Sequence, residues 1–398
     1  MDNTPRTAFN WLINESSLWP PRGRPEPPFG PTAIEIMRSC MLRIYFECSK
    51  GYERRTAYAA RVGIAFHRTL QSLTENPIGS SNPDVIVEQA SLRFREELAL
   101  QETQKSSRPR EQMLTRNEER VQRALESVIV EALRLAKYFS GRPIAPEHRR
   151  QRADVPNNSA ISTHPDGSDG FVVVEIPVQS QDGLLAGRID YAERLPNGGV
   201  RLIDYKSALR ADLPERYERQ LQLYALLWHE TFGEWPAEAY VVYPFTGATH
   251  KVAVDPAICL QVGHEARQIA QKPQAGLSAE HLASPGTVCT VCEFRPWCRP
   301  FWRWQASHAS HSQALEDAVY GFEGTILALE RKDYHWKVTV RWREAEVRIV
   351  APQERFPQLK NARVGMRIRA LDMRLHGSVC SPPPSPSSCR RSQVDFLA

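Results

Sequence analysis

The chain has 398 residues, of which 41% are hydrophobic and 24% are charged, and its formal net charge is +5. This composition is typical of a soluble globular protein with one or two hydrophobic cores, and it excludes a predominantly disordered chain. The sequence has no apolar run as long as a membrane span, and its first residues lack the features of a secretory signal, so we expect a cytoplasmic protein.

The first part of the chain combines a proline-rich arm with segments of helical pattern. Residues 19–31 read WPPRGRPEPPFGP, so we expect residues 1–31 to form an arm and regular order to begin near Thr32. Apolar residues then recur at helical spacing in three segments, 33–73, 85–101 and 112–140. The first third of the ordered chain is therefore predicted to be mostly helical.

The middle of the chain has the pattern of a small sheet. The polar residues 151–170 predict a loop, and the cluster PNGG at 196–199 is typical of a hairpin turn. Three strands of an antiparallel meander are predicted at 171–179, 183–195 and 200–206. A helix over 217–233 and a strand over 237–245 complete a mixed α/β domain with a central sheet.

Short alternating strands follow in the C-terminal part, where residues 322–376 hold 12 Lys and Arg against 7 Asp and Glu. In HWKVTVRW (335–342) aromatic and β-branched residues alternate with polar ones, which predicts a small β-barrel over residues 318–376 that is similar to an OB-fold. Basic residues are expected on its outer face, namely Lys337, Arg341, Arg348, Arg367 and Arg369. This face is either a second surface that holds DNA or a solvated face of a structural appendage. Residues 377–398, with SPPPSPSS, are expected to be disordered.

Two aspartates and a lysine occupy the apolar strands of the predicted hairpin. Asp190 and Asp204 are each seven residues from Asn197, so folding about that residue brings them near each other. Lys206 lies two residues after Asp204 and shares its face. Two neighbouring carboxylates raise each other's pKa unless a cation lies between them, and a divalent ion with oxygen ligands is the usual cation.

Glu175 in the preceding strand and His67 in an early helical segment are candidate companions at this site. An imidazole with carboxylates suits Mn²⁺ and permits Mg²⁺, and such a site can hydrolyse phosphodiesters. Each residue also has an ordinary interpretation: an unremarkable histidine, an ion pair between Asp204 and Lys206, and an ion pair from Glu175 to an arginine such as Arg188 or Arg201.

These residues follow one another in a recognisable order: His67, Glu175, Gly187-x-x-Asp190, Asp204-Tyr205-Lys206 and Gln220-x-x-x-Tyr224. The series resembles the PD-(D/E)XK nuclease superfamily, specifically its RecB-like branch. The resemblance implies an α/β fold in which helices flank a sheet, with His67, Asp190, Asp204 and the carbonyl of Tyr205 as metal ligands. It also implies that Lys206 is catalytic, that Glu175 is a further catalytic acid, and that Gln220 and Tyr224 support the site or contact the substrate backbone. The alternative for Gln220 and Tyr224 is a helix face that only packs on the sheet.

Three cysteines near the end of this region, Cys289, Cys292 and Cys298, have a spacing typical of metal ligands, and Cys40 is the candidate for a fourth. Cys48 and Cys259 are the runners-up, while Cys380 and Cys389 lie in the expected disordered tail. The arrangement resembles the iron-sulfur nucleases of the same branch, which are the AddB type, the CRISPR-associated RecB-like exonucleases and the exonuclease V family. That resemblance implies a [4Fe-4S] cluster, and Zn²⁺ is the alternative.

Tryptophans crowd these cysteines, with arginines beside them: Trp297, Trp302 and Trp304, and Arg295, Arg299 and Arg303. They form either a stacking platform for unpaired bases or a shield that keeps water from the cluster. The sequence contains no P-loop motif, so any unwinding of DNA must come from a helicase or another partner.

The predicted organisation is an arm over 1–31, a nuclease domain with its cysteine clasp over 32–310, the barrel over 318–376 and the tail. The predicted function is a metal-dependent nuclease, specifically a single-stranded DNA exonuclease in repair, recombination or defence. One alternative is a non-catalytic iron-sulfur subunit that binds DNA within a helicase-nuclease complex. A third is a zinc-stapled RNA nuclease or structural protein.

Overall fold

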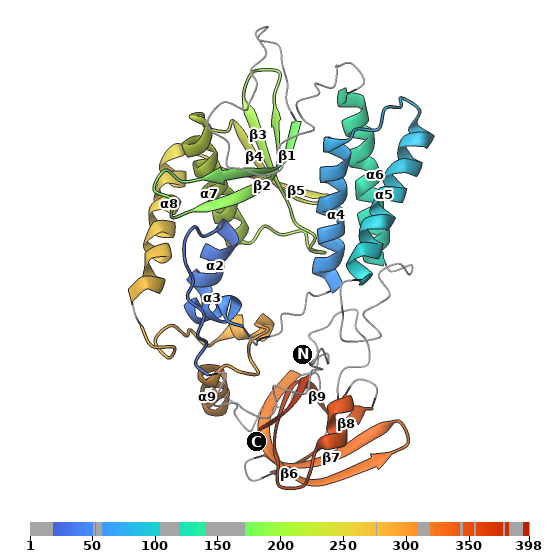
Figure 1. The fold of residues 1–398 in the computed structure, drawn as a ribbon, viewed down its shortest axis with the longest axis vertical. Coiled ribbons are helices and arrows are strands. Elements are labelled where there is room, and N and C mark those ends of the chain that lie inside the picture. Colours follow the sequence, from blue (N-terminus) through green and yellow to red (C-terminus); the bar gives the residue numbers. More distant parts are fainter. Residues whose placement is uncertain are drawn as a thin grey trace, which may run out of the picture. The chain divides into compact units, whose positions relative to one another are not determined.

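The structure is a computed structural model, and it describes residues 19–50, 52, 58–103, 119–139, 172–275, 277–308, 319–342, 345–353, 356–376, 379–381 and 393–397. The chain divides into two compact units (Figure 1). The first combines Met1–Pro25, Ser39–Arg54 and Gly276–Ala398, and the second combines Glu26–Arg38 with Arg55–Ala275. The cysteine-rich segment therefore groups with the C-terminal strands, whereas we expected it inside a domain of residues 32–310. The expected loop at 151–170 lies outside the described residues.

The helices of the second unit are α2 (Pro31–Ser39), which ends at the unit boundary, α4 (Tyr58–Glu75), α5 (Pro83–Thr103), α6 (Glu119–Phe139), α7 (Glu215–Phe232) and α8 (Pro256–Gln271), followed by the 3₁₀ turn η3 (Lys272–Ala275). The helical pattern predicted over 33–73 is confirmed, and it comprises α2, α3 (Met41–Cys48) and α4. Cys40 separates α2 from α3 because its backbone is extended, with φ −161° and ψ 104°, and extended Ser49 ends α3.

Five strands form the sheet of this unit: β1 (Val172–Gln179), β2 (Ala186–Arg194), β3 (Val200–Tyr205), β4 (Glu238–Tyr243) and β5 (Ala248–Val252). They are hydrogen-bonded in the order β1-β2-β3-β4-β5, and β3 and β4 are parallel. Helix α7 makes the crossover between that parallel pair. The pairing of Tyr191 with Ile203 and of Ala192 with Leu202 confirms the hairpin register predicted about Asn197. Strand β5 and helix α8 were not predicted.

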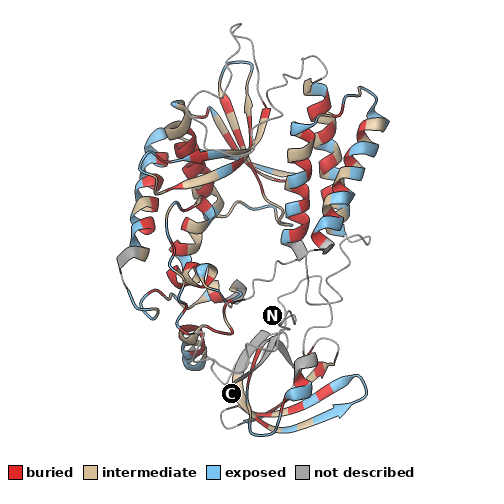
Figure 2. Ribbon diagram, viewed as in Figure 1, coloured by how far each residue is buried: buried red, intermediate tan, exposed pale blue. Residues whose placement is uncertain are grey.

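Helices cover both faces of this sheet, with α4, α5 and α6 on one side and α7 and α8 on the other (Figure 1). The buried residues of α4, α5 and α6 form one apolar cluster with Tyr191 and Tyr205 from the sheet. Figure 2 shows the buried positions of these helices concentrated on their inner faces. Burial of one stripe of each helix explains the helical spacing seen in the sequence. None of the described helices is both long enough and apolar enough to cross a membrane.

Order begins earlier than the expected Thr32. The ring of Phe29 is 5% exposed, and its backbone N–H donates to the carbonyl of Leu184 at 2.9 Å. The carbonyl of Phe29 in turn accepts from the N–H of Ala186 at 3.1 Å. A proline-rich segment can be ordered in this way because its few free backbone groups are satisfied by a neighbouring strand.

The first unit contains α3, the 3₁₀ turn η4 (Thr287–Val291), α9 (Arg299–His308) and the C-terminal strands. These strands are β6 (Val319–Lys332), β7 (His335–Trp342), β8 (Ala345–Pro352), β9 (Arg367–His376), β10 (Val379–Ser381) and β11 (Gln393–Leu397), and the 3₁₀ turn η5 (Pro357–Asn361) lies between β8 and β9. Their order is β10-β8-β7-β6-β9-β11, and an additional pairing of β10 with β9 closes five of them into a ring.

The expectation of disorder from residue 377 onward was wrong for β10 and β11. Strand β10 pairs in parallel with β8 and antiparallel with β9, so it supplies the closing strand of the ring. Its signal is weak because it is three residues long and is followed by a proline-rich stretch. A strand this short is formed by its partners on both edges rather than by its own propensity.

The alternation predicted for 335–342 is confirmed, because Trp336, Val338 and Val340 are buried and Lys337 and Arg341 are exposed. Arg369 is a correction to the predicted outer face. It is 6% exposed, and its guanidinium lies over the ring of Trp302 at 4.9 Å from the ring centre. It donates to Glu323 Oε2 at 2.8 Å and to the carbonyl of Pro296 at 3.0 Å. This arginine is buried because the outer face of β9 is covered at that point.

Candidate active site

Three side chains from three elements converge in the second unit. His67 on α4, Glu175 on β1 and Asp190 on β2 each offer a ligand atom, and these atoms all lie within 4.8 Å of one another. His67 Nδ1 is 3.8 Å from Asp190 Oδ1. All three residues are half-buried, so they are reachable from solvent while still partly removed from it. A nitrogen donor with two carboxylates fits a divalent ion such as Mn²⁺ or Mg²⁺.

Glu175 has a backbone conformation that is unusual for a strand. Its φ is +52°, a region that residues other than glycine rarely adopt and that costs about 1–3 kcal/mol. The pairs Val174–Tyr191 and Ile176–Ile189 flank it, so Glu175 lies opposite Asp190. Burial, and then repulsion by Asp190, raise the pKa of Glu175, while His67 and Arg188 oppose that rise. A cation at this point would relieve the repulsion.

The ordinary interpretation of Glu175 as an ion-pair partner finds little support. Arg188 Nη1 donates to the backbone carbonyl of Glu175 at 3.3 Å rather than to its carboxylate. Arg201 makes its ion pairs with Glu193 and Glu238.

Asp204 and Lys206 form a buried ion pair beside these three residues. Lys206 Nζ lies 2.7 Å from Asp204 Oδ2 and 3.0 Å from Oδ1, and Asp204 is 5% exposed. Asp190 Oδ2 accepts a hydrogen bond from the N–H of Tyr205 at 2.8 Å. Burial raises the pKa of Asp190, as does the Asp204 carboxylate, while His67, Lys206 and the Tyr205 N–H lower it. Asp204 is thus adjacent to the ligand group, with its charge balanced by lysine, and its role as a metal ligand stays a prediction.

Lys206 is held by more than its aspartate. Gln220 on α7 accepts from Lys206 Nζ through its Oε1 at 2.9 Å. The ring of Tyr217, one turn earlier on α7, has the Lys206 ammonium 4.7 Å from its centre. Gln220 Nε2 donates to Thr32 Oγ1 on α2 at 2.6 Å. Sequence reasoning missed Tyr217 and Thr32; one helical turn connects Tyr217 to the predicted Gln220, but no local signal marks Thr32.

Tyr224 explains the glycine of the Gly187-x-x-Asp190 motif. A Cβ at Gly187 would lie 2.8 Å from Cε1 of Tyr224 and 3.0 Å from Cδ of Pro31. Only glycine therefore allows α7 and the start of α2 to approach β2 this closely. Burial, followed by the carboxylates of Asp204, Asp190 and Glu175, raises the pKa of Tyr224, so it remains a neutral phenol.

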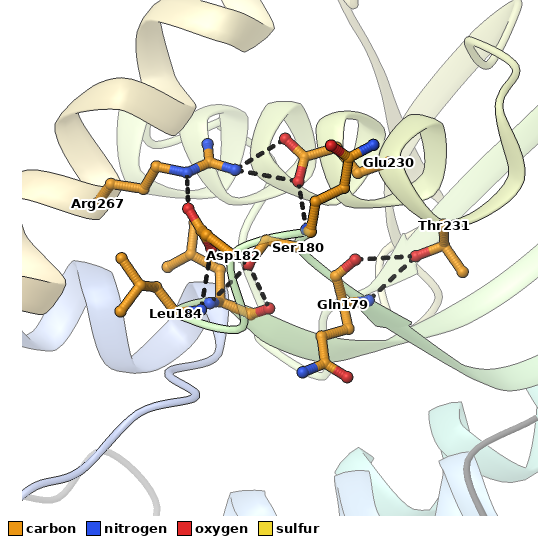
Figure 3. A network of polar contacts seen from close by, with 9 residues as sticks. Gln179, Ser180, Asp182, Leu184, Glu230, Thr231 and Arg267 are labelled. Carbon is orange, nitrogen blue, oxygen red and sulfur yellow. Dashed lines mark hydrogen bonds and ion pairs between the residues drawn. The ribbon is translucent and has the colours of Figure 1, made fainter.

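A polar network fixes the far end of the β1–β2 hairpin against α7 and α8 (Figure 3). Asp182 accepts from the hydroxyl of Ser180 at 2.6 Å and from the N–H of Leu184 at 3.0 Å, and it pairs with Arg267. Arg267 also pairs with Glu230 on α7 at 2.8 Å. Because the hairpin carries Glu175 and Asp190, these contacts help to hold both carboxylates in place relative to α7.

The predicted cysteine ligands lie together in the first unit. Burial raises the pKa of Cys289, Cys292 and Cys298, and the charge of Cys40 raises each of them further. The runners-up differ: Cys48 is exposed, and Cys259 is buried in α8 of the second unit. The side chains of Cys380 and Cys389 lie outside the described residues.

The spacing of these sulfurs bears on which group they could hold. Among the described residues, the ligand atoms gathered within 4.8 Å are those of His67, Glu175 and Asp190, and the cysteine sulfurs do not form such a group. A tetrahedral zinc ion with bonds of about 2.3 Å needs sulfurs about 3.8 Å apart. The four thiols are donors that suit either zinc or an iron-sulfur cluster.

The tryptophans near the cysteines are mostly buried. Trp297 is 8% exposed and Trp302 is 7% exposed, and Trp302 packs in one apolar cluster with Cys289 and Phe301. Trp297 packs edge-on against Tyr52 at 5.4 Å. Buried rings are not available to stack on bases, so of the two interpretations these two residues favour the shield.

The second unit thus presents a metal-ligand group beside an Asp-x-Lys pair on an α/β fold. Residues 28–299 match the PD-(D/E)XK nuclease superfamily. This match covers more than half of the chain, so the protein belongs to that superfamily, whose members are typically metal-dependent nucleases that use ions such as Mg²⁺ or Mn²⁺.

Two solved structures are similar to this chain at low scores. The tetrameric p202 HIN2 has a TM-score of 0.18 and 11% sequence identity, and the match covers 21% of this chain and 44% of that chain, less than half of its length. SSO0001 has a TM-score of 0.22 and 12% identity, with 60% of this chain and 95% of that chain covered. Neither similarity is strong enough to define the fold. No curated protein matches this chain closely enough to count as a relative.

Proposed function

We propose that this protein is a metal-dependent deoxyribonuclease that degrades single-stranded DNA from its ends, and that it is an iron-sulfur member of the RecB-like branch. The observation that carries the catalytic part is the convergence of His67, Glu175 and Asp190, within 4.8 Å of one another, beside the Asp204–Lys206 pair. This group of residues contains ligands for a metal ion and, in Lys206, a positive side chain, and both can support phosphodiester hydrolysis.

The residues of the site divide the chemical work. His67, Glu175 and Asp190 would hold a divalent ion, with Asp204 and the carbonyl of Tyr205 as further ligands implied by the family resemblance. A bound Mg²⁺ or Mn²⁺ supplies polarisation of the phosphoryl oxygen and a lowered pKa of bound water. Lys206, fixed by Asp204 and Gln220, donates hydrogen bonds toward the negative charge that develops on the phosphate. Tyr224 packs against Gly187 and keeps α7 at its distance from β2.

The experiment uses full-length protein with single-stranded DNA, duplex DNA and single-stranded RNA, each labelled at the 5′ or the 3′ end. Each substrate is incubated with Mg²⁺, Mn²⁺ or a chelator. We expect metal-dependent shortening of single-stranded DNA from one end, abolished by Asp190→Ala and by Lys206→Ala. Lys251→Ala, which removes an ammonium from the exposed face of β5, is the matched control and should leave the rate unchanged.

The same experiment separates the alternatives. DNA binding without cleavage under every ion condition would refute the enzyme and favour a non-catalytic DNA-binding subunit. Cleavage of RNA in preference to DNA would refute the substrate class but not the metal site. Cleavage that survives both Asp190→Ala and Lys206→Ala would come from a contaminant or from a different site.

The cysteine site is proposed to hold a [4Fe-4S] cluster built on Cys40, Cys289, Cys292 and Cys298. Support comes from the three cysteines of the C-x₂-C-x₅-C segment with Cys40 in the same unit, and from Trp302, which packs in one apolar cluster with Cys289. Protein purified without oxygen should be coloured and should contain iron and acid-labile sulfide. A colourless protein that contains zinc in place of iron would refute the cluster and leave the nuclease proposal standing.

A further inference from the structure

We propose that Thr32 is a positioning residue for Lys206, and that it acts by fixing the orientation of the Gln220 amide. The inference rests on the proposed nuclease function and concerns the same site. It starts from a continuous series of contacts that runs from the first turn of α2 to the buried Asp204.

The lysine determines which end of the Gln220 amide must face it. An ammonium group has three donors and no acceptor, so it can be satisfied only by the amide oxygen. Gln220 Oε1 is 2.9 Å from Lys206 Nζ, and Gln220 is 6% exposed. A rotated amide would bring its NH₂ against the ammonium, and neither group could then accept a hydrogen bond from the other.

The other end of the amide needs an acceptor, and Thr32 provides it. Gln220 Nε2 donates to Thr32 Oγ1 at 2.6 Å. Without that oxygen, the buried NH₂ would lose this partner, and the orientation that serves Lys206 would be penalised by the cost of an unsatisfied donor. The hydroxyl of Thr32 and the ammonium of Lys206 therefore select the same amide orientation from opposite ends.

Helix α2 is itself held firmly enough for this role. Glu35, one turn after Thr32, pairs with Arg219 on α7 at 2.7 Å, and Arg219 is adjacent to Gln220 in the chain. Pro31 packs against Gly187, where a Cβ would lie 3.0 Å from Pro31 Cδ. The backbone of Phe29 is bonded to the β1–β2 hairpin. These contacts therefore fix the position of Thr32 relative to α7.

Thr32 is an exposed residue, and valine conserves its shape. Valine nevertheless leaves the buried Gln220 NH₂ without this acceptor, which should lower the stability of the fold, so the effect on kcat and on Lys206 has to identify the positioning role. Loss of the hydroxyl should lower kcat about 3- to 10-fold, the range given by one hydrogen bond, without an equal change in KM.

The experiment compares Thr32→Val, which removes the hydroxyl, with Thr32→Ser, which retains it. Thr249→Val makes the same chemical change at an exposed threonine on β5 and is the matched control. We expect the serine variant and the control to keep the wild-type kcat, and the valine variant to have a lower kcat with an unchanged KM. In a Gln220→Leu background, Thr32→Val should have no further effect.

A second measurement does not depend on activity. The ε-amine of Lys206 is acetylated with an amine-reactive ester, and its rate of modification is read by peptide mass spectrometry relative to Lys251. Thr32→Val should increase the relative rate for Lys206 about threefold or more, because the loss of one hydrogen bond loosens its acceptor, and Thr32→Ser should not.

The outcomes are distinguishable from those that test the nuclease itself. If the wild-type protein cleaves nothing but the modification rate changes as expected, the positioning role stands and the proposed function fails. If the protein cleaves DNA and Thr32→Val keeps both its kcat and its Lys206 modification rate, the positioning role is refuted. A rise in KM alone would also refute it, because that result would make Thr32 a substrate contact.

Discussion

Replacement of Gly187 by alanine is the sharpest test of how the site is built. This glycine begins the Gly187-x-x-Asp190 motif, and its neighbours are the ring of Tyr224 on α7 and Pro31 on α2. An added Cβ would lie 2.8 Å from Tyr224 Cε1 and 3.0 Å from Pro31 Cδ. Both contacts are shorter than van der Waals contact allows, and neither neighbour is the free end of a flexible chain.

The size of the effect follows from these two contacts. Adding a methyl group to a tightly packed place costs about 1–3 kcal/mol, and 1 kcal/mol shifts the melting temperature of a unit this size by about 2–4 °C. We therefore expect Gly187→Ala to lower the melting temperature by about 2–12 °C. The rate of DNA cleavage should also fall, because the displaced Tyr224 lies on the same helix as Gln220, which bonds to Lys206.

Gly79→Ala provides the matched control. Gly79 has no neighbour within 4 Å of an added Cβ, and its backbone does not require glycine. Alanine at such a place is expected to be neutral or to stabilise by about 0.4–1 kcal/mol. Both variants are measured by thermal unfolding and by cleavage of end-labelled DNA. Equal melting temperatures for the two variants, with equal rates, would refute the close approach of α7 and α2 to β2.

Three further predictions follow. Burial alone would raise the pKa of Asp182, but hydrogen bonds from Ser180 and Arg267 lower it to about 2. The contribution of Asp182 to the free energy of unfolding should therefore be complete above the unfolded pKa of about 3.9 and be lost as the pH falls through 2. Asp182→Asn should remove this pH dependence from a plot of unfolding free energy against pH. If Cys40, Cys289, Cys292 and Cys298 hold the proposed cluster, Cys292→Ala should abolish iron binding and lower the melting temperature, because the cluster would close a loop from Cys40 to Cys289 worth about 5 kcal/mol, whereas the exposed Cys48→Ala should change neither. If the barrel holds DNA, the double variant Lys337→Ala/Arg341→Ala should reduce the slope of log affinity against log salt by about 2, and an unchanged slope would make the barrel an appendage.

The sequence predicted what local rules control. The hairpin register about Asn197 follows from a turn cluster and a two-residue period, and it correctly set Asp190 beside the strand of Asp204. The family resemblance implied His67 and Asp190 as metal ligands with Glu175 as a candidate companion, and the structure brings the ligand atoms of these three residues together. The roles of these residues in catalysis stay predictions.

Long-range contacts left no such signal. Thr32 and Gln220 are 188 residues apart, and nothing in either segment alone specifies that they meet. The positive φ of Glu175 is likewise invisible in an apolar strand, because it depends on how β1 and β2 pair around it. Strand β5 has a short and polar sequence, ATHKV, which tertiary pairing with β4 makes into a strand.

Arg369 shows where the alternation rule itself ceases to apply. In β9 the neighbours Ile368, Arg369 and Ala370 are all buried, so both faces of the strand are covered there. Ile368 and Ala370 belong to the core of the barrel, whereas Arg369 bonds to the carbonyl of Pro296, which lies between Cys292 and Cys298 in the chain. Alternation assigns residues to two faces, but it does not say whether the second face meets water.

The partners of Arg369 also argue against a folding boundary near residue 310. A buried guanidinium is tolerated only when its charge and donors are matched, and here Glu323, Pro296 and the face of Trp302 supply the match. Pro296 and Trp302 lie in the segment from Cys289 to the end of α9, and Glu323 lies on β6. Cutting the chain between α9 and β6 would leave the carbonyl of Pro296 and the ring of Trp302 without that cover. The barrel is therefore part of the environment of the cysteine site, and if that site holds the proposed cluster, a protein shortened before β6 should lose iron faster than the full chain.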